Sequence, residues 1–360
     1  MGKEEFADAV GTLGPALLST LVGLEYAERH LHPPAMEPVR AALEPLDARL
    51  DEGRVALRGV LRSGQVPAQL DSFAAQLGSA ADYASEALIR FTEPARDVAR
   101  VLEGMHFHHR AEAALYPLRH ALPPVSRFFI EDAVADSLLA LDPESPDAST
   151  GLHSASNAPG ERGGFSLYVP ESYRQGECLP LIVALHGGSG HGADFLWTWL
   201  REARSRRCLL LAPTSQKSTW SLMGPDIDTP QLIRMVEHIS GQWGVDRERI
   251  LLTGLSDGAT FALLSGLQEA SPFTALAPTS GVLHPANFGN GNIGRAAGKR
   301  IYLIHGVLDW MFPIALARTA AEELDKAGAD LTFREIVDLS HTYPREENAK
   351  ILDWFGVPTG

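Results

Sequence analysis

Three residues able to do chemistry together each follow an apolar run: a serine, an aspartate and a histidine. Ser256 is at the centre of residues 254–258, Gly-Leu-Ser-Asp-Gly, between the apolar residues 249–253 and a helical pattern over 259–267. This is a G-x-S-x-G pattern in a strand-to-helix context, which predicts a serine on a strained turn with its hydroxyl presented for attack. The flanking glycines, which have no side chain, allow neighbouring backbone segments to approach the turn closely. The predicted chemistry is nucleophilic attack on an acyl group.

A serine hydroxyl becomes a useful nucleophile only beside a base, and that base needs an acid to hold its tautomer. The expected chain order is serine, then acid, then histidine. Asp309 follows the strand-like run 301–304, and His341 follows the alternating run 331–339. We therefore expect Asp309 as the acid and His341 as the base. Asp338 is the weaker candidate for the acid, because it lies inside the strand that leads to the histidine.

From about Gly163 to Gly356 the chain resembles an α/β-hydrolase. More narrowly, it is similar to the small esterases grouped around phospholipase/carboxylesterase, polyhydroxybutyrate depolymerase and feruloyl esterase. Those families carry an H-G oxyanion motif, G-x-S-x-G, H-G-x-x-D-x-x-V-P and a late histidine. The corresponding runs here are 186–188, His-Gly-Gly, then 254–258, and 305–313, His-Gly-Val-Leu-Asp-Trp-Met-Phe-Pro.

The resemblance implies catalytic roles for Ser256, Asp309 and His341, and oxyanion donors from the backbone N–H groups of Gly188 and Asp257. Phe312 stands where the family usually has valine, which changes the apolar wall beside the acid. His186 and His305 are expected to be structural, because backbone N–H groups stabilise an oxyanion. We expect a pocket lined by Trp220, Trp310 and Phe312. The resemblance requires no cofactor.

Strand-like and helical runs alternate from residue 164 onward, which predicts a mostly parallel sheet covered by helices. The expected strands are 165–169, 181–185, 209–212, 250–253, 274–277, 301–304 and 331–336. Functional residues in such folds gather beyond the carboxyl ends of the strands.

An all-α helical bundle is predicted before the catalytic part. Apolar residues recur three and four apart, as in Leu43, Leu46 and Leu50, which is typical of packed amphipathic helices. Pro45 and Pro94 each predict a kink or a break. The expected domains are 1–145, helical and accessory, a linker at 146–162, and 163–358, catalytic. The helical domain is no standard part of the resembled families, so oligomerisation, partner docking and a cap over the active site all stay open as its role.

Several histidines fall in this helical part and raise the question of a metal site. They are residues 106, 108 and 109, with His30, His32 and His120. Their spacing gives little support for ligands on one helical face. We expect surface or core histidines and no metal.

Composition narrows the partners and the compartment. The 360 residues carry a formal charge of −14, concentrated in the first part, so no basic footprint for nucleic acid exists. The start lacks a secretory leader pattern, no apolar run is expected to span a membrane, and the two cysteines suit reduced thiols. A cytoplasmic protein is predicted. Its expected partner is a small-molecule ester substrate, and the N-terminal helices could form a homo-oligomer.

The predicted function is hydrolysis of carboxylic esters through an acyl-enzyme. A thioesterase or a peptidase-like acyl hydrolase would use the same three residues, because only the shape of the pocket differs. A non-catalytic binding or scaffold protein is the alternative of another class, and an intact serine, acid and histidine in the expected order argues against it.

Overall fold

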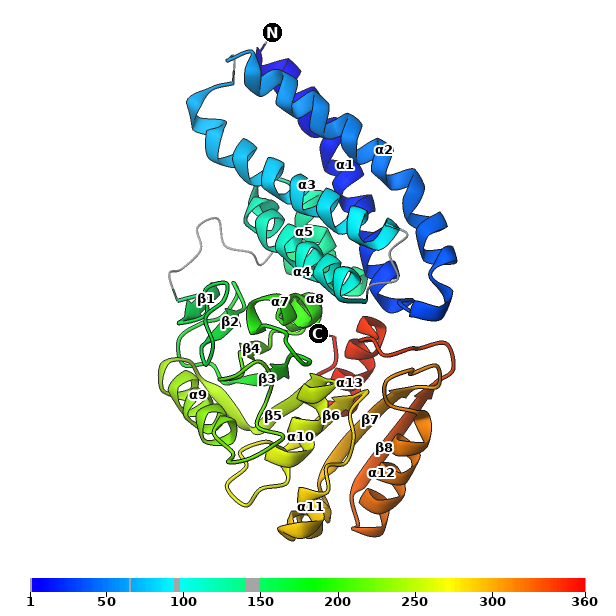
Figure 1. Ribbon diagram of the computed structural model, residues 1–360. Helices are drawn as coiled ribbons and strands as arrows, with labels where there is room; N and C mark the ends of the chain where they lie inside the picture. Colours follow the sequence, from blue (N-terminus) through cyan, green and yellow to red (C-terminus); the bar gives the residue numbers. More distant parts are fainter. Residues whose placement is uncertain (1, 65, 94–97, 140–148, 360) are drawn as a thin grey trace. The chain divides into compact units, whose positions relative to one another are not determined.

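The computed structural model describes residues 2–64, 66–93, 98–139 and 149–359 (Figure 1). The chain divides into two compact units, Met1–Phe129 and Ile130–Gly360. Each unit has its own secondary structure, helical in the first and a sheet with helices in the second.

The first unit is built from four long helices, as the apolar spacing predicted (Figure 1). Helices α1 and α2 pack against each other, and each has a row of buried leucines, among them Leu17 in α1 and Leu50 in α2. At one point the two helices approach so closely that a Cβ on Gly53 would lie 2.8 Å from the Cα of Leu13. The elements are α1 Gly2–Arg29, η1 Pro33–Ala35, α2 Glu37–Arg62, η2 Ala68–Leu70, α3 Asp71–Thr92, α4 Val98–Leu115, η3 Tyr116–His120 and α5 Pro123–Phe128.

Two prolines lie inside helices of this unit in the part of the chain that the structure describes. Pro45 lies inside α2 and Pro15 inside α1, so of the kink or break predicted at Pro45, a break does not occur. A proline costs one hydrogen bond and some steric strain within a helix, and the long buried stripes on both sides offset that cost. The break predicted at Pro94 falls outside the described residues.

The expectation that no run is apolar enough to span a membrane needs correction. Helix α1, over Lys3–Arg29, passes a length and composition test with a mean hydropathy of 1.4. Its leucines at 13, 17, 21 and 24 are fully buried, and the helix packs against α2 and α3. The core helix of a bundle meets the same test, so this feature is weak support for a membrane span.

The second unit contains an eight-stranded sheet in the order β1-β2-β4-β3-β5-β6-β7-β8 (Figure 1). The pairs β1–β2 and β2–β4 are antiparallel, and every later pair is parallel, which confirms the predicted mostly parallel sheet. The strands are β1 Gly151–Ala155, β2 Phe165–Val169, β3 Leu179–Leu185, β4 Leu209–Pro213, β5 Val245–Leu255, β6 Ala275–Thr279, β7 Arg300–Gly306 and β8 Asp330–Ile336.

Helices pack on this sheet and bury its apolar side chains. One core cluster joins alternate residues of the central strands, such as Leu181 and Val183, to α9, α10 and α12. Helices α8 and α13 pack against each other. The helices are η4 Asp132–Val134, α6 Ala135–Leu139, α7 Gly192–Phe195, α8 Trp197–Ser205, α9 Asp228–Gln242, α10 Asp257–Gly266, α11 Ala286–Gly289, η5 Asn292–Ala296, α12 Ile314–Lys326, η6 Arg345–Glu347 and α13 Asn348–Phe355.

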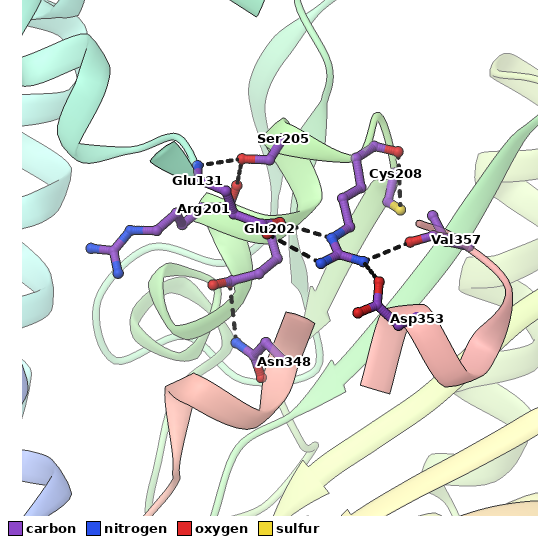
Figure 2. A network of polar contacts seen from close by, with 9 residues as sticks. Glu131, Arg201, Glu202, Ser205, Cys208, Asn348, Asp353 and Val357 are labelled. Atoms are coloured by element: carbon purple, nitrogen blue, oxygen red, sulfur yellow. Dashed lines mark hydrogen bonds and ion pairs between the residues drawn. The ribbon is translucent and has the colours of Figure 1, made fainter. Parts of the chain in front are cut away.

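The units divide at residues 129/130, earlier than the boundary expected at residue 145, and Glu131 bonds to helix α8 and to Arg206 of the second unit. Glu131 accepts hydrogen bonds from Arg206 at 2.8 and 3.1 Å and donates its N–H to Ser205 Oγ at 2.7 Å. Arg206 also reaches the carboxylate of Asp353 and, at 2.9 Å, the carbonyl of Val357 (Figure 2). The buried guanidinium of Arg206 thus connects Glu131, near the start of this unit, to Asp353 and Val357, near its end.

The segment 146–162, expected to be a linker, contains a strand. Residues 151–155 form β1, which pairs along its whole length with β2 at the edge of the sheet. Residues 146–148 and the predicted boundary at 145 lie outside the described residues.

Candidate active site

Ser256 occupies the sharp turn between β5 and α10. Its backbone has φ 56° and ψ −118°, a region that non-glycine residues rarely adopt. Packing requires both flanking glycines. A Cβ on Gly254 would lie 2.7 Å from the carbonyl carbon of Gly258, and a Cβ on Gly258 would clash with the carbonyl oxygens of Leu185 and His186. The sequence pattern therefore produces the strained turn that it predicted.

Three side chains from separate segments meet at this turn. Ser256 Oγ lies 2.9 Å from His341 Nε2, and His341 Nδ1 lies 2.8 Å from Asp309 Oδ2. With the Nδ1 proton donated to the carboxylate, Nε2 presents its lone pair to the hydroxyl. All three residues sit beyond the carboxyl ends of strands, namely β5, β7 and the loop after β8. This geometry allows the hydroxyl proton to pass to the imidazole as a bond to carbon forms.

Asp309 is held by the turn that follows it. Its Oδ1 accepts hydrogen bonds from the N–H groups of Met311 at 2.9 Å and Phe312 at 2.8 Å. His305 Nε2 lies 2.7 Å from the carbonyl of Phe312 and 3.3 Å from Asp309 Oδ2, which fits the turn-shaping role expected of this histidine.

Burial alone would raise the pKa of Asp309, but its hydrogen bonds outweigh burial. The bonds from His341 and from the Phe312 N–H, with the charges of His341 and His305, hold the pKa below its ordinary value. Burial lowers the pKa of His305. The carboxylate is therefore the charged member of the group and can stabilise a positive charge that develops on His341.

The two predicted oxyanion donors lie on adjacent segments. Asp257 is the first residue of α10, where helix N–H groups have no intrahelical partner. Its carboxylate fills the space beside Gly188: a Cβ on Gly188 would lie 2.8 Å from Asp257 Oδ2. Thr219 donates to that same Oδ2 at 2.6 Å. The Asp257 side chain thus links the loop of Gly188, the loop of Thr219 and the nucleophile turn.

His186 is a structural residue of the Gly188 loop. Its Nδ1 lies 2.6 Å from the carbonyl of Gly187, and its Nε2 accepts the N–H of Ser215 at 3.1 Å. Burial lowers its pKa to about 3, so the ring is neutral and both contacts have a fixed direction. Its carbonyl also accepts the indole N–H of Trp220 at 2.7 Å.

The three predicted pocket residues do not share one environment. Trp220 is buried in the core cluster, stacks on Phe261 at 5.4 Å and donates its indole N–H to the carbonyl of His186. Phe312 packs edge-on against His341 at 5.2 Å, and Trp310 is 43% exposed. Phe312 therefore lies beside His341, whereas Trp310 is a largely exposed residue that follows Asp309 directly in the chain.

A buried polar network anchors the loop that carries His341. Tyr343 donates to Asn348 Oδ1 at 2.9 Å, and Asn348 Nδ2 donates to the carbonyl of Thr198 at 2.8 Å. Asn348 Nδ2 also donates to Glu202 Oε2 at 3.2 Å (Figure 2). Burial raises the pKa of Glu202 to about 7. These hydrogen bonds connect the loop that carries His341 and Tyr343 to helices α8 and α13.

Sequence reasoning missed several supporting residues. Thr219 bonds to Asp257, 38 positions away, and Glu202 bonds to Asn348, 146 positions away, so no local spacing marks these contacts. The N–H groups of Met311 and Phe312 were also missed, although an aspartate two or three residues before a free N–H is a common turn pattern.

Part of the chain is similar to known proteins. Residues 226–355 match the family model described as Phospholipase/Carboxylesterase. A stretch of 147 residues is 26% identical to the bifunctional acetylxylan esterase/xylanase XynS20E of Neocallimastix patriciarum, covering 40% of this chain and 21% of that protein. The chain thus spans about a fifth of the length of this curated relative.

Solved structures with a similar fold include two esterases. A thermostable esterase is 19% identical, with a TM-score of 0.47, over 57% of this chain and 62% of its own. The acetyl xylan esterase from Aspergillus awamori is 17% identical, with a TM-score of 0.46, over 57% of this chain and 99% of its own.

Residues 226–355 of the second unit are thus similar to the phospholipase/carboxylesterase family, and they lie in a unit built on a mostly parallel sheet flanked by helices.

Proposed function

We propose that the second unit hydrolyses carboxylic esters through an acyl-enzyme. Ser256 is the nucleophile, His341 the general base and Asp309 the acid that orients it. The observation that carries this proposal is the continuous series of contacts of 2.9 and 2.8 Å from Ser256 Oγ through His341 to Asp309 Oδ2. The strained backbone of Ser256 adds support, because such strain gathers at functional turns.

In the first half of the reaction, His341 Nε2 takes the hydroxyl proton while Ser256 Oγ attacks the ester carbonyl carbon. The carbonyl oxygen becomes an oxyanion, which the N–H groups of Gly188 and Asp257 stabilise. The imidazolium then gives its proton to the leaving alkoxide. Asp309 keeps its negative charge throughout and stabilises the imidazolium.

In the second half, water replaces the alcohol. His341 takes a proton from the water as its oxygen attacks the acyl carbon, and the same two N–H groups stabilise the second oxyanion. When the tetrahedral intermediate collapses, the proton returns to Ser256 Oγ and the carboxylic acid leaves. No atom outside the substrate, water and these residues is needed.

A thioesterase or a peptidase-like acyl hydrolase would use the same series of contacts. Trp310 and Phe312, beside the acid and base, supply apolar surface for an acyl or alcohol group. The name of the matched relative makes an acetyl ester a reasonable first substrate to test. The cytoplasmic location and a homo-oligomer through the N-terminal helices stay predictions from the sequence.

The proposal is tested with p-nitrophenyl acetate and its longer-chain homologues. Ser256→Ala should lower kcat by roughly 10³-fold or more, because it removes the nucleophile. Ser265→Ala is the matched control, since Ser265 is a fully buried serine of the adjacent helix α10 with no part in the contacts described. Full ester hydrolysis by a folded Ser256→Ala protein would refute the assignment.

A further inference from the structure

Two helices of the first unit bring three ligand-type side chains together. Glu28 lies in the last turn of α1, and His108 and His109 lie in the middle of α4. His108 Nδ1 is 2.8 Å from Glu28 Oε1, and His109 Nε2 is 3.9 Å from Glu28 Oε2. The three ligand atoms all lie within 4.8 Å of one another, and all three residues are buried.

A second carboxylate lies on the far side of His108. Glu112, one turn further along α4, has its Oε2 4.0 Å from His108 Nε2, and it is only 1% exposed. The His108 ring is therefore flanked by one carboxylate at each nitrogen.

The tautomer of His108 decides which of its ring nitrogens can act as a ligand. If Nε2 carries the ring proton toward Glu112, the Nδ1 lone pair points at Glu28. A lone pair 2.8 Å from a carboxylate oxygen is unfavourable unless a cation lies between them. Metal-bound histidines commonly have this pattern, with the remote ring N–H donated to a carboxylate that orients the ring.

We propose that Glu28, His108 and His109 bind a divalent transition-metal ion, and that Glu112 orients His108. Two imidazole nitrogens with a carboxylate suit Zn²⁺ or Fe²⁺, whereas Ca²⁺ and Mg²⁺ prefer sites built from oxygen alone. Three protein ligands leave at least one coordination position for water or another small ligand. The inference concerns the helical unit and does not rest on the proposed ester hydrolase.

The separations between ligand atoms suit such an ion after small side-chain rotations. Bonds of about 2.1 Å place two ligand atoms roughly 3.0 to 3.4 Å apart in octahedral or tetrahedral geometry. The contact of 2.8 Å between Glu28 and His108 is slightly shorter than this, and that of 3.9 Å between Glu28 and His109 is somewhat longer. An ion between them would therefore draw the His109 ring inward.

The ion would join helices that are far apart in sequence. Glu28 and His108 are separated by 80 positions, so coordination links the end of α1 to α4. Because an ion that binds only the folded state stabilises it, metal should raise the melting temperature of the helical unit. No metal was predicted, because the spacing of histidines along one helix does not reveal a carboxylate that another helix contributes.

The experiment uses the full chain, stripped with a chelator and titrated separately with Zn²⁺, Co²⁺ and, without oxygen, Fe²⁺. Metal content after dialysis is measured by mass spectrometry, and the Co²⁺ form is examined by absorption and X-ray absorption spectroscopy. The expected result is one ion per chain, imidazole ligation in the spectra, and a higher melting temperature. Glu28→Gln and His109→Gln should each weaken binding by at least tenfold, and Glu112→Gln by about 10- to 100-fold.

His30→Gln is the matched control. His30 follows α1 directly, but its Nδ1 bonds to the carbonyl of Tyr26 and its ring stacks on that tyrosine, so metal binding should be unchanged. The proposal is overturned if the wild-type chain shows no saturable binding at one ion per chain, or if Glu28→Gln and His109→Gln bind as the wild type does. Circular dichroism checks that each variant is folded. If a variant is not, the spectra of the wild-type Co²⁺ form decide, since a lack of imidazole ligation there also overturns the proposal.

Discussion

The carboxylate of Asp257 lies where a side chain on Gly188 would have to be, with Oδ2 2.8 Å from the position of a Cβ. Asp257, the residue after Ser256, therefore limits the space for a side chain at position 188. Any larger residue at 188 must displace either this carboxylate or the backbone that carries the proposed oxyanion donor.

Gly188→Ala should consequently reduce kcat by roughly 10²-fold, the usual loss when one oxyanion donor is misplaced. KM should change little, because the effect falls on the transition state. Gly241→Ala is the control, since a Cβ there meets nothing within 4 Å. Unchanged kcat in a folded Gly188→Ala protein would remove Gly188 from the oxyanion site.

Asp309→Asn should lower kcat by about 10⁴-fold, because the amide no longer fixes the His341 tautomer or stabilises its charge. Asp338 was the weaker candidate for the acid and lies three residues before His341. Asp338→Asn should leave kcat within a few-fold of the wild type. Steady-state kinetics on one activated ester compares the two. Equal losses would mean that the acid is misassigned.

The lowered pKa of Asp309 also determines a pH dependence. A carboxyl group whose folded-state pKa is below its unfolded value stabilises the fold above the unfolded pKa, and that contribution disappears as pH falls through the folded pKa. Chemical denaturation of the wild type should therefore show stability declining on the acid side, with a shallower decline in Asp309→Asn. Identical acid-side slopes would argue against a charged Asp309 in the folded state.

Glu202 should act in the opposite direction. Its pKa is raised to about 7 by burial, so the folded protein binds a proton that the unfolded chain has already released. Its contribution to stability is present below the unfolded pKa and is lost as pH rises toward about 7. The slope cannot exceed about 1.4 kcal/mol per pH unit for one proton.

Glu202→Gln should remove this slope between about pH 5 and 7 while keeping the hydrogen bond to Asn348. Urea unfolding at several pH values measures it, with Glu248→Gln at an exposed position as the control. A Glu202→Gln protein with the wild-type slope would show that this carboxyl does not titrate in that range.

Much of the hydrolase fold could be predicted because its signals are local. Apolar strands, a glycine-flanked serine and the order of acid and base appear within short stretches, and the same steric limits that define the turn at Ser256 also restrict its sequence. Strand β1 was missed because Gly-Leu-His-Ser-Ala is short and mostly exposed, and gains its stability by pairing with β2. The residues of β1 alone therefore do not predict a strand, because its formation depends on pairing with β2.

The remaining differences have the same cause. Helix α2 continues through Pro45 because its buried stripe outweighs a local preference. Glu131 belongs with Arg206, 75 positions later, so no local composition could have marked residue 130 as the start of the second unit. The hydrogen bond from the indole N–H of Trp220 to the carbonyl of His186 spans 34 positions, so the sequence could not show this contact either.

The division at residue 130 makes a prediction about truncation. A chain beginning at Ile130 should fold and hydrolyse a small activated ester, because it keeps β1 and the Glu131–Arg206 contacts. A chain beginning at Gly160 loses both and leaves the buried Arg206 without one carboxylate, a change that costs about 3–5 kcal/mol for a buried pair. Thermal unfolding of the two chains measures the difference. Equal melting temperatures would contradict the boundary.

The central claim is tested most directly by the mass and site of a covalent adduct formed with a fluorophosphonate. Such a probe phosphonylates an activated serine, so the wild-type protein should gain one adduct per chain, and peptide mapping should locate it on Ser256. Ser256→Ala should gain none under the same conditions, while Ser265→Ala should react as the wild type does. An adduct on another serine, or a folded wild-type protein that stays unlabelled, would contradict the account.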